Sequence, residues 1–147
     1  MLAIDNLTTD LDSDHGLVRA VDALTLTIDR GETFALVGES GCGKWMTALS
    51  ILRLLPDNGR VSAGRVDVDG VDITQLPEAR MRDIRGRRIS ISFQEPSTSL
   101  DPVMTVGRQI AEVIERHTAW SGGQPLAKAV EWRMRDDSVM PGRRGGD

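Results

Sequence analysis

Aromatic residues and cysteine are scarce in this sequence of 147 residues, and both shortages exclude classes of function. The chain has two Phe, three Trp and no Tyr, so an aromatic platform for stacking nucleic-acid bases is not expected. A net charge of -4 at pH 7 gives no electrostatic reason to expect nucleic-acid binding either. Because Cys42 is the only cysteine, no intrachain disulfide can form, which suits a reducing cytoplasm.

Long apolar runs are also lacking. The stretch from Ile51 to Leu55 is interrupted by Arg53 and is far shorter than the ~20 apolar residues of a membrane-spanning helix. The first residues, MLAIDNLTTDLDSD, are acidic and have no apolar core of the kind that secretory signals carry. We therefore expect no direct membrane insertion, and any membrane association would have to come through a partner.

Strand-like and helix-like stretches alternate through most of the chain. The patterns predict strands at 2–7, 17–28, 33–37, 64–73 (as a strand pair) and 88–93. They predict helices at 44–55, 75–85, 106–117 and 125–134. The run from Thr33 to Val37 is almost continuously apolar, which is typical of a strand buried on both faces. Mixed charge with many Gly and Pro predicts that residues 119–147 form a divergent, partly disordered tail.

The clearest chemical motif is a glycine-rich stretch ending in lysine, between a predicted strand and a predicted helix. Its residues are Gly38, Glu39, Ser40, Gly41, Cys42, Gly43 and Lys44. Glycines allow a tight turn whose backbone N–H groups approach phosphate oxygens, and the following helix points its positive end at the same anion. The lysine adds a point charge. The motif predicts a phosphate-binding loop; a glycine-rich turn with an incidental lysine is the weaker interpretation.

One position departs from the pattern of such loops. The residue after Lys44 should be Ser or Thr, whose hydroxyl binds Mg²⁺, but it is Trp45. An indole has only an N–H donor and cannot bind a cation as a ligand. Thr47 lies two positions further along and would project from a different side of the helix. We therefore predict weak nucleotide binding that does not depend on metal.

A second informative segment runs from Ser92 to Pro102 and reads SFQEPSTSLDP. Together the two segments resemble the ATP-binding subunits of ABC transporters, most closely the importers of dipeptides, oligopeptides or nickel. Further similar segments occur in the same order, and the resemblance covers roughly residues 1 to 118. They are Ala20 to Asp22, Arg30 to Thr33, Ile84 to Gly86, Thr105 to Gly107, and Gln109 to Ile110.

The resemblance implies a fold and a set of roles. The fold would be α/β, an incomplete P-loop NTPase core with an N-terminal antiparallel β subdomain and a mixed sheet flanked by helices. Residues 1–118 would be the N-terminal portion of the nucleotide-binding domain. Residues 38–44 would surround the phosphates of ATP, and Gln94 would contact Mg²⁺ and the attacking water. The segment from Glu95 to Pro102 would lie near the membrane partner.

The same resemblance implies partners and a location. The partners would be transmembrane permease subunits and a second ATP-binding subunit, and no nucleic acid. The chain would be a cytoplasmic protein, peripheral on the inner face of the plasma membrane. It would couple ATP binding and hydrolysis to import of peptide or metal.

Several parts of the family pattern are missing from this sequence. No apolar run ends in Asp-Glu, the Walker B feature that holds the metal, and neither histidine stands where the family's switch histidine is expected. Residues Trp120 to Gln124 resemble the family's signature motif, but they follow Gln94 too closely, and we interpret them as a polar loop. We therefore expect an ABC-type ATPase by resemblance whose hydrolysis is deficient in this chain alone.

Three other interpretations stay open. The chain is alternatively a non-enzymatic fragment that docks on transporter subunits through residues 95–102, or the product of a decayed gene. A small kinase or GTPase is a further alternative. Against that alternative stand Trp45 and the lack of a guanine-reading Asn-Lys-x-Asp stretch.

Overall fold

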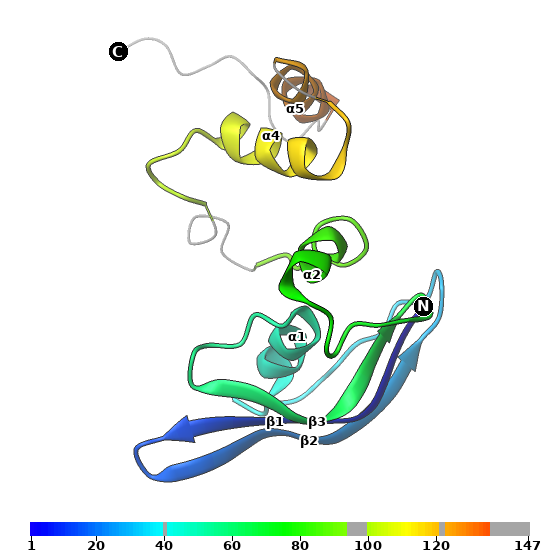
Figure 1. Ribbon diagram of the computed structural model, residues 1–147, viewed down its shortest axis with the longest axis vertical. Coiled ribbons are helices and arrows are strands. Elements are labelled where there is room, and N and C mark those ends of the chain that lie inside the picture. Colours follow the sequence, from blue (N-terminus) through cyan, green and yellow to red (C-terminus); the bar gives the residue numbers. More distant parts are fainter. Residues whose placement is uncertain (40, 94–99, 121–122, 136–147) are drawn as a thin grey trace. The chain divides into compact units, whose positions relative to one another are not determined.

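The computed structural model describes residues 1–39, 41–93, 100–120 and 123–135 (Figure 1). The chain divides into two compact units, Met1–Ile91 and Ser92–Asp147. The first contains an antiparallel sheet with helices on it, and the second contains two helices. The predicted site at residues 38–44 lies in the first unit, so its geometry follows from the packing of that unit.

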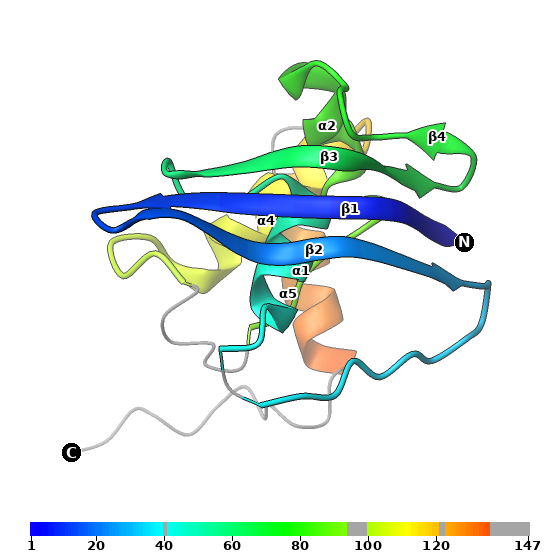
Figure 2. The same cartoon turned by 90° about the horizontal axis from the view of Figure 1, so that it is seen from below.

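Four strands form the sheet of the first unit, in the order β2-β1-β3-β4 (Figure 2). They are β1 (Leu2–Ser13), β2 (Gly16–Ile28), β3 (Gly59–Val68) and β4 (Val71–Asp72). All pairings are antiparallel, and β1 and β2 are joined by a tight hairpin in which Ser13 faces Gly16. The predicted strand pair at 64–73 is confirmed as the second half of β3 and the short β4.

Strand β1 extends beyond the predicted strand at 2–7. The prediction ended too early because buried polar residues interrupt the apolar pattern of the strand. Thr8, Thr9 and Asp10 are all buried. The Thr9 hydroxyl lies 2.7 Å from that of Ser50, and Asp10 accepts from Arg19 Nε at 3.0 Å. Hydrogen bonds of this kind offset the cost of burying polar groups, and hydrophobic periodicity alone does not reveal them.

Two helices, α1 (Lys44–Leu52) and α2 (Glu78–Ile84), belong to this unit, and the apolar core joins them to one face of the sheet (Figures 1 and 2). The buried core consists of Ile4, Leu7, Val66, Val68, Ile73, Met81 and Ile84. Helix α1 ends three residues before its predicted end. Arg53 adopts a left-handed conformation (φ 52°), and Leu54 N donates to Leu49 O at 2.9 Å. This bond closes the helix in the manner of a Schellman turn.

Two predicted strands are wrong. Residues 33–37 form no strand, and they are exposed instead of buried: 46% of Phe34 and 90% of Val37 is accessible. Residues 90–93 have no regular structure, and Ile89 makes only an isolated bridge with Arg85. Both runs have strand-like composition, but no described strand lies beside them. A central strand is defined by the strands on either side, so composition alone does not form one.

The second unit contains α4 (Val106–His117) and α5 (Gln124–Arg135), and both predicted helices are confirmed. Thr105 caps α4, because its hydroxyl accepts from Arg108 N at 3.3 Å. Ala111 and Ile114 are the buried residues of α4. Among the described residues, every helix is too short or too polar to span a bilayer.

Candidate phosphate-binding site

The glycine-rich loop turns directly into α1. Gly41 and Gly43 have positive φ angles of 84° and 89°, a region that side chains with a Cβ rarely adopt. A Cβ on Gly43 would lie 2.3 Å from Ala20 O on strand β2, so only glycine fits against that strand. The first helical bond follows at once, with Thr47 N donating to Gly43 O at 2.8 Å. The end of the loop at Gly43 is therefore packed closely against β2, at the start of α1.

The lysine of the motif is folded over its own loop. Lys44 Nζ donates to Gly38 O and to Glu39 O, both at 2.6 Å. It also lies 3.2 Å from Cys42 Sγ. The ammonium thus lies among the loop carbonyls, at the N-terminal end of α1, where the backbone N–H groups have no partner within the helix. A phosphate entering the loop would find a cation and a helix N-terminus at one place.

The thiol of Cys42 is exposed and shares the environment of this cation. The hydrogen bond from Lys44 is the largest cause that lowers the pKa of Cys42 from its ordinary value, and the lysine charge acts in the same direction. Partial desolvation opposes both effects. The pKa of the thiol is therefore sensitive to the position of the Lys44 ammonium.

A hollow of about 220 Å³ lies beside the loop, between β2 and α1. Its lining combines apolar side chains with polar groups, among them one carboxylate and the site lysine, and none of the described lining residues is aromatic. The lining residues are Ala20, Val21, Asp22, Leu24, Leu36, Val37, Cys42, Lys44 and Thr47. The sequence segment 20–22 had no assigned role before the structure showed it beside the loop.

The model of the family described as "ABC transporter" matches residues 21–140. The chain belongs to the ABC transporter family. The match includes the phosphate-binding loop, the second part of β2, strands β3 and β4, and the helices of both units, and it begins after β1. It also continues past residue 118, where the resemblance places the end of the N-terminal portion; that boundary stays a prediction.

Relatives within the ABC transporter family are named as ATP-binding proteins of peptide transport. The chain is 44% identical over 145 residues to a probable peptide ABC transporter ATP-binding protein of Sinorhizobium fredii. This alignment spans 98% of this chain and 43% of the relative. The chain is 43% identical over 82% of its length to the dipeptide transport ATP-binding protein DppD of Bacillus subtilis, and 39% identical over 98% to the oligopeptide transport ATP-binding protein OppD of Salmonella typhimurium. It therefore spans about two fifths of the length of these curated relatives.

Solved ABC transporter structures confirm the predicted fold class. The chain superposes on a dimeric structure of the bacterial ABC transporter cassette MJ0796 with a TM-score of 0.71 and 25% identity. The superposition covers 89% of this chain and 55% of that one. A second structure of MJ0796, described as a post-hydrolysis state bound to ADP and Pi, superposes with the same TM-score at 24% identity and shows the fold alone.

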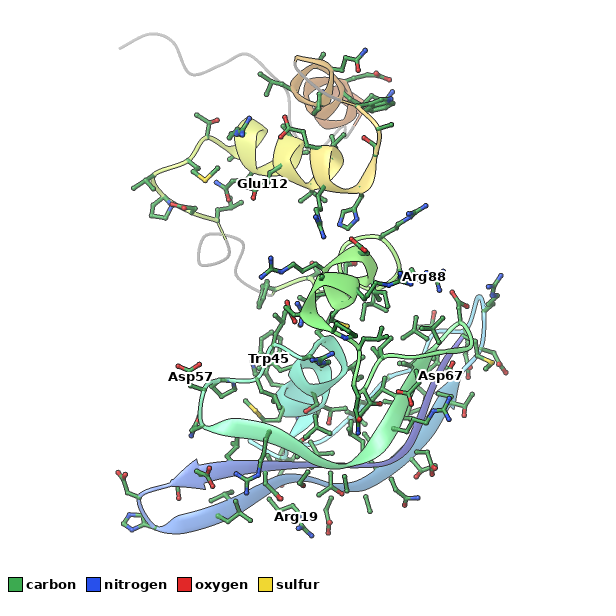
Figure 3. All side chains as sticks on the ribbon, in the orientation of Figure 1. Arg19, Trp45, Asp57, Asp67, Arg88 and Glu112 are labelled. Carbon is green, nitrogen blue, oxygen red and sulfur yellow. The ribbon has the colours of Figure 1, made fainter. Side chains whose placement is uncertain are left out.

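Position 45 does not offer the hydroxyl that the ABC family pattern would supply to Mg²⁺. Trp45 lies in the first turn of α1 with 47% of its side chain exposed (Figure 3). Thr47 is buried, and its hydroxyl donates to Gly43 O at 3.1 Å. In the described parts of the chain, no three His, Cys, Asp or Glu residues are grouped to hold a metal. The described residues around the loop therefore do not fit a magnesium site.

The structure brings together most of the predicted site residues. Gly38, Glu39 and Cys42 contact the Lys44 ammonium, and Gly41 and Gly43 shape the turn between them and α1. Ser40 and the predicted metal and water contact Gln94 lie outside the described residues, as do residues 95–99 of the predicted docking segment. The roles assigned to them stay predictions.

Proposed function

We propose that this chain binds the polyphosphate of ATP as part of the ATP-binding subunit of a peptide-importing ABC transporter. The observation that carries the proposal is the loop itself. Two glycines in the left-handed region bring the backbone into the start of α1, and the Lys44 ammonium stands within the same loop. Membership of the ABC transporter family and similarity to peptide-transport relatives support the transport context.

Binding of ATP is expected to occur without hydrolysis by this chain alone. The described donors around the loop do not fit Mg²⁺, and the sequence has no apolar run that ends in Asp-Glu. Phosphoryl transfer depends on positioning and on neutralising charge around the phosphates, and the metal normally supplies a large part of both. A loop with Lys44 but no metal ligand can hold the anion, but it lacks the groups that would activate water.

The proposal is tested by measuring the Kd of ATP by isothermal titration calorimetry, in Mg²⁺ and in EDTA. Replacing Lys44→Ala removes the cation of the loop, so we expect affinity to fall about tenfold or more. Lys128→Ala is the matched control, since Lys128 pairs with Glu131 in the other unit. The wild-type Kd should be similar in both buffers. Equal affinity of wild type and Lys44→Ala would contradict the proposed site, and much tighter binding with Mg²⁺ would contradict metal independence.

The misfit to Mg²⁺ also favours a second candidate function. In this alternative the chain is a non-enzymatic fragment that docks on transporter subunits. The partners would be permease subunits and a second ATP-binding subunit, at the inner face of the plasma membrane. Co-purification with a permease subunit, lost when residues 95–102 are replaced by a Gly-Ser linker of equal length, distinguishes this function. It predicts docking whose strength does not change in the Lys44→Ala variant.

A further inference from the structure

Arg85 follows α2 directly, and its guanidinium reaches the far end of α1. Its Nε donates to Leu52 O at 2.7 Å, and its Nη2 donates to Arg53 O at 2.9 Å. The last carbonyls of a helix have no partner within it, and a cation at that end is favourable. Only 18% of the Arg85 side chain is exposed, so little water competes for these carbonyls. Arg85 thus caps α1 from a neighbouring helix.

The guanidinium is held in place from its other side by Glu78, the first residue of α2. Arg85 Nη1 donates to Glu78 Oε1 at 2.6 Å, and Nη2 lies 3.4 Å from Glu78 Oε2. The Arg85 hydrogen bond is the largest cause that lowers the pKa of Glu78. A planar guanidinium fixed by a carboxylate presents its remaining N–H groups in one direction, which a flexible ammonium cannot do.

A second arginine strengthens the same junction. Arg53 directly follows the last residue of α1, and its Nη1 donates to Leu76 O and, at 3.5 Å, to Ile73 O in the connection between β4 and α2. The end of α1 is therefore attached to this connection and to α2 by side chains that run in both directions. The two ends of α1 have different surroundings. Lys44 begins the helix at the phosphate-binding loop, and Leu52 ends it with its carbonyl bonded to Arg85.

We propose that Arg85 is a positioning residue for nucleotide binding, which it serves by fixing the C-terminal end of α1 against α2. The proposal rests on the proposed function above. A helix of nine residues is a rigid rod roughly 13 Å long, so a tilt allowed at one end displaces Lys44 at the other. The chain also runs from Arg85 through Ile89 toward Gln94. The capped junction therefore joins the phosphate-binding helix to the start of the segment that leads to Gln94.

The test uses Trp45 as a reporter of the phosphate-binding end of α1. The replacements Trp120→Phe and Trp132→Phe leave Trp45 as the sole tryptophan. In this background Arg85→Met, Arg85→Lys and Arg82→Met are compared. Arg82 is the matched control, because it contacts the same Glu78 at 3.4 Å from a side chain that is 66% exposed.

Arg85→Met should shift the Trp45 emission and weaken ATP binding in EDTA about tenfold, because the released end of α1 no longer fixes the position of Lys44. Arg85→Lys keeps the charge and one donor but not the planar fork, so its Trp45 emission and ATP affinity should lie between those of Arg85→Met and those of the background. Arg82→Met should match the background in both readouts. Equal emission and affinity in Arg85→Met and Arg82→Met would overturn the proposal.

The proposal can still be tested if Arg85→Met does not fold or if the background protein binds no ATP. If Arg85→Met does not fold, as judged by circular dichroism, the Arg85→Lys variant provides the test. A Trp45 emission and an ATP affinity equal to those of the background would then contradict the need for the two hydrogen bonds from Arg85 to the end of α1. If the background protein binds no ATP, the proposed function has failed. The Trp45 emission, measured without nucleotide, then still supports or overturns the positioning role of Arg85.

Discussion

At the scale of single residues, the contact between Cys42 and Lys44 gives the loop an intrinsic chemical reporter. Their Sγ and Nζ atoms are 3.2 Å apart, and this contact lowers the pKa of the thiol. A lowered pKa means that the reactive thiolate is present at a lower pH than in a free cysteine. Loss of the ammonium should raise the pKa back toward its ordinary value and slow alkylation near neutral pH.

Alkylation by iodoacetamide, followed by mass spectrometry from pH 6 to 10, measures this shift. The midpoint of the rate profile should be higher in Lys44→Met than in wild type, because the favourable charge and hydrogen bond are gone. Lys128→Met removes the same charge from a side chain paired with Glu131 and should leave the midpoint unchanged. Identical midpoints in all three proteins would show that Lys44 does not stand beside the thiol in solution.

At the scale of elements, one buried hydrogen bond joins strand β1 to helix α1. The Ser50 hydroxyl donates to Met46 O at 2.5 Å, which leaves Thr9 as the donor in the 2.7 Å contact between the two hydroxyls. Thr9 is fully buried, and Ser50 is 2% exposed. Because little water reaches either group, removing one hydroxyl leaves the other buried without this hydrogen-bond partner.

Ser50→Ala should therefore lower the free energy of unfolding by about 1–3 kcal/mol. The double variant Thr9→Val with Ser50→Ala should lose less than the sum of the two single variants, because no hydroxyl is left stranded. Urea denaturation of the four proteins gives this cycle, and the exposed Thr27→Val on β2 is a control expected within about 0.5 kcal/mol of wild type. Additive losses would mean that the two side chains do not interact.

The same elements show which parts of the fold could be predicted from the sequence. Helix α4, strand β2 and the loop from Gly38 to Lys44 follow local rules of helical periodicity, alternation and glycine spacing, and all three were predicted. The second half of β1 was missed, because Thr9 and Asp10 are buried through partners distant in sequence, Ser50 and Arg19. The cap of Arg85 on α1 was missed for the same reason.

At the scale of the whole molecule, the strand-like run at 33–37 is the main departure from expectation. It has the composition of a buried strand, yet no described strand pairs with it, and the side chains of Phe34, Leu36 and Val37 are exposed. Beside it lies an apolar hollow of about 250 Å³ between the sheet and α1, lined in part by Leu26 and Ile51. Extended apolar backbone without a partner strand is prone to pair with other chains.

We therefore expect this segment to drive self-association of the chain. Val37→Lys places a charge on a side chain that is 90% exposed, so it should reduce association without lowering the free energy of unfolding. Val103→Lys is the matched control: its side chain is 89% exposed, but it lies in the connection before α4, outside the 33–37 run. Light scattering after size-exclusion chromatography should show fewer oligomers for Val37→Lys alone. An equal reduction in both variants would assign the effect to net charge, and no reduction in either would mean that the exposed run does not govern association.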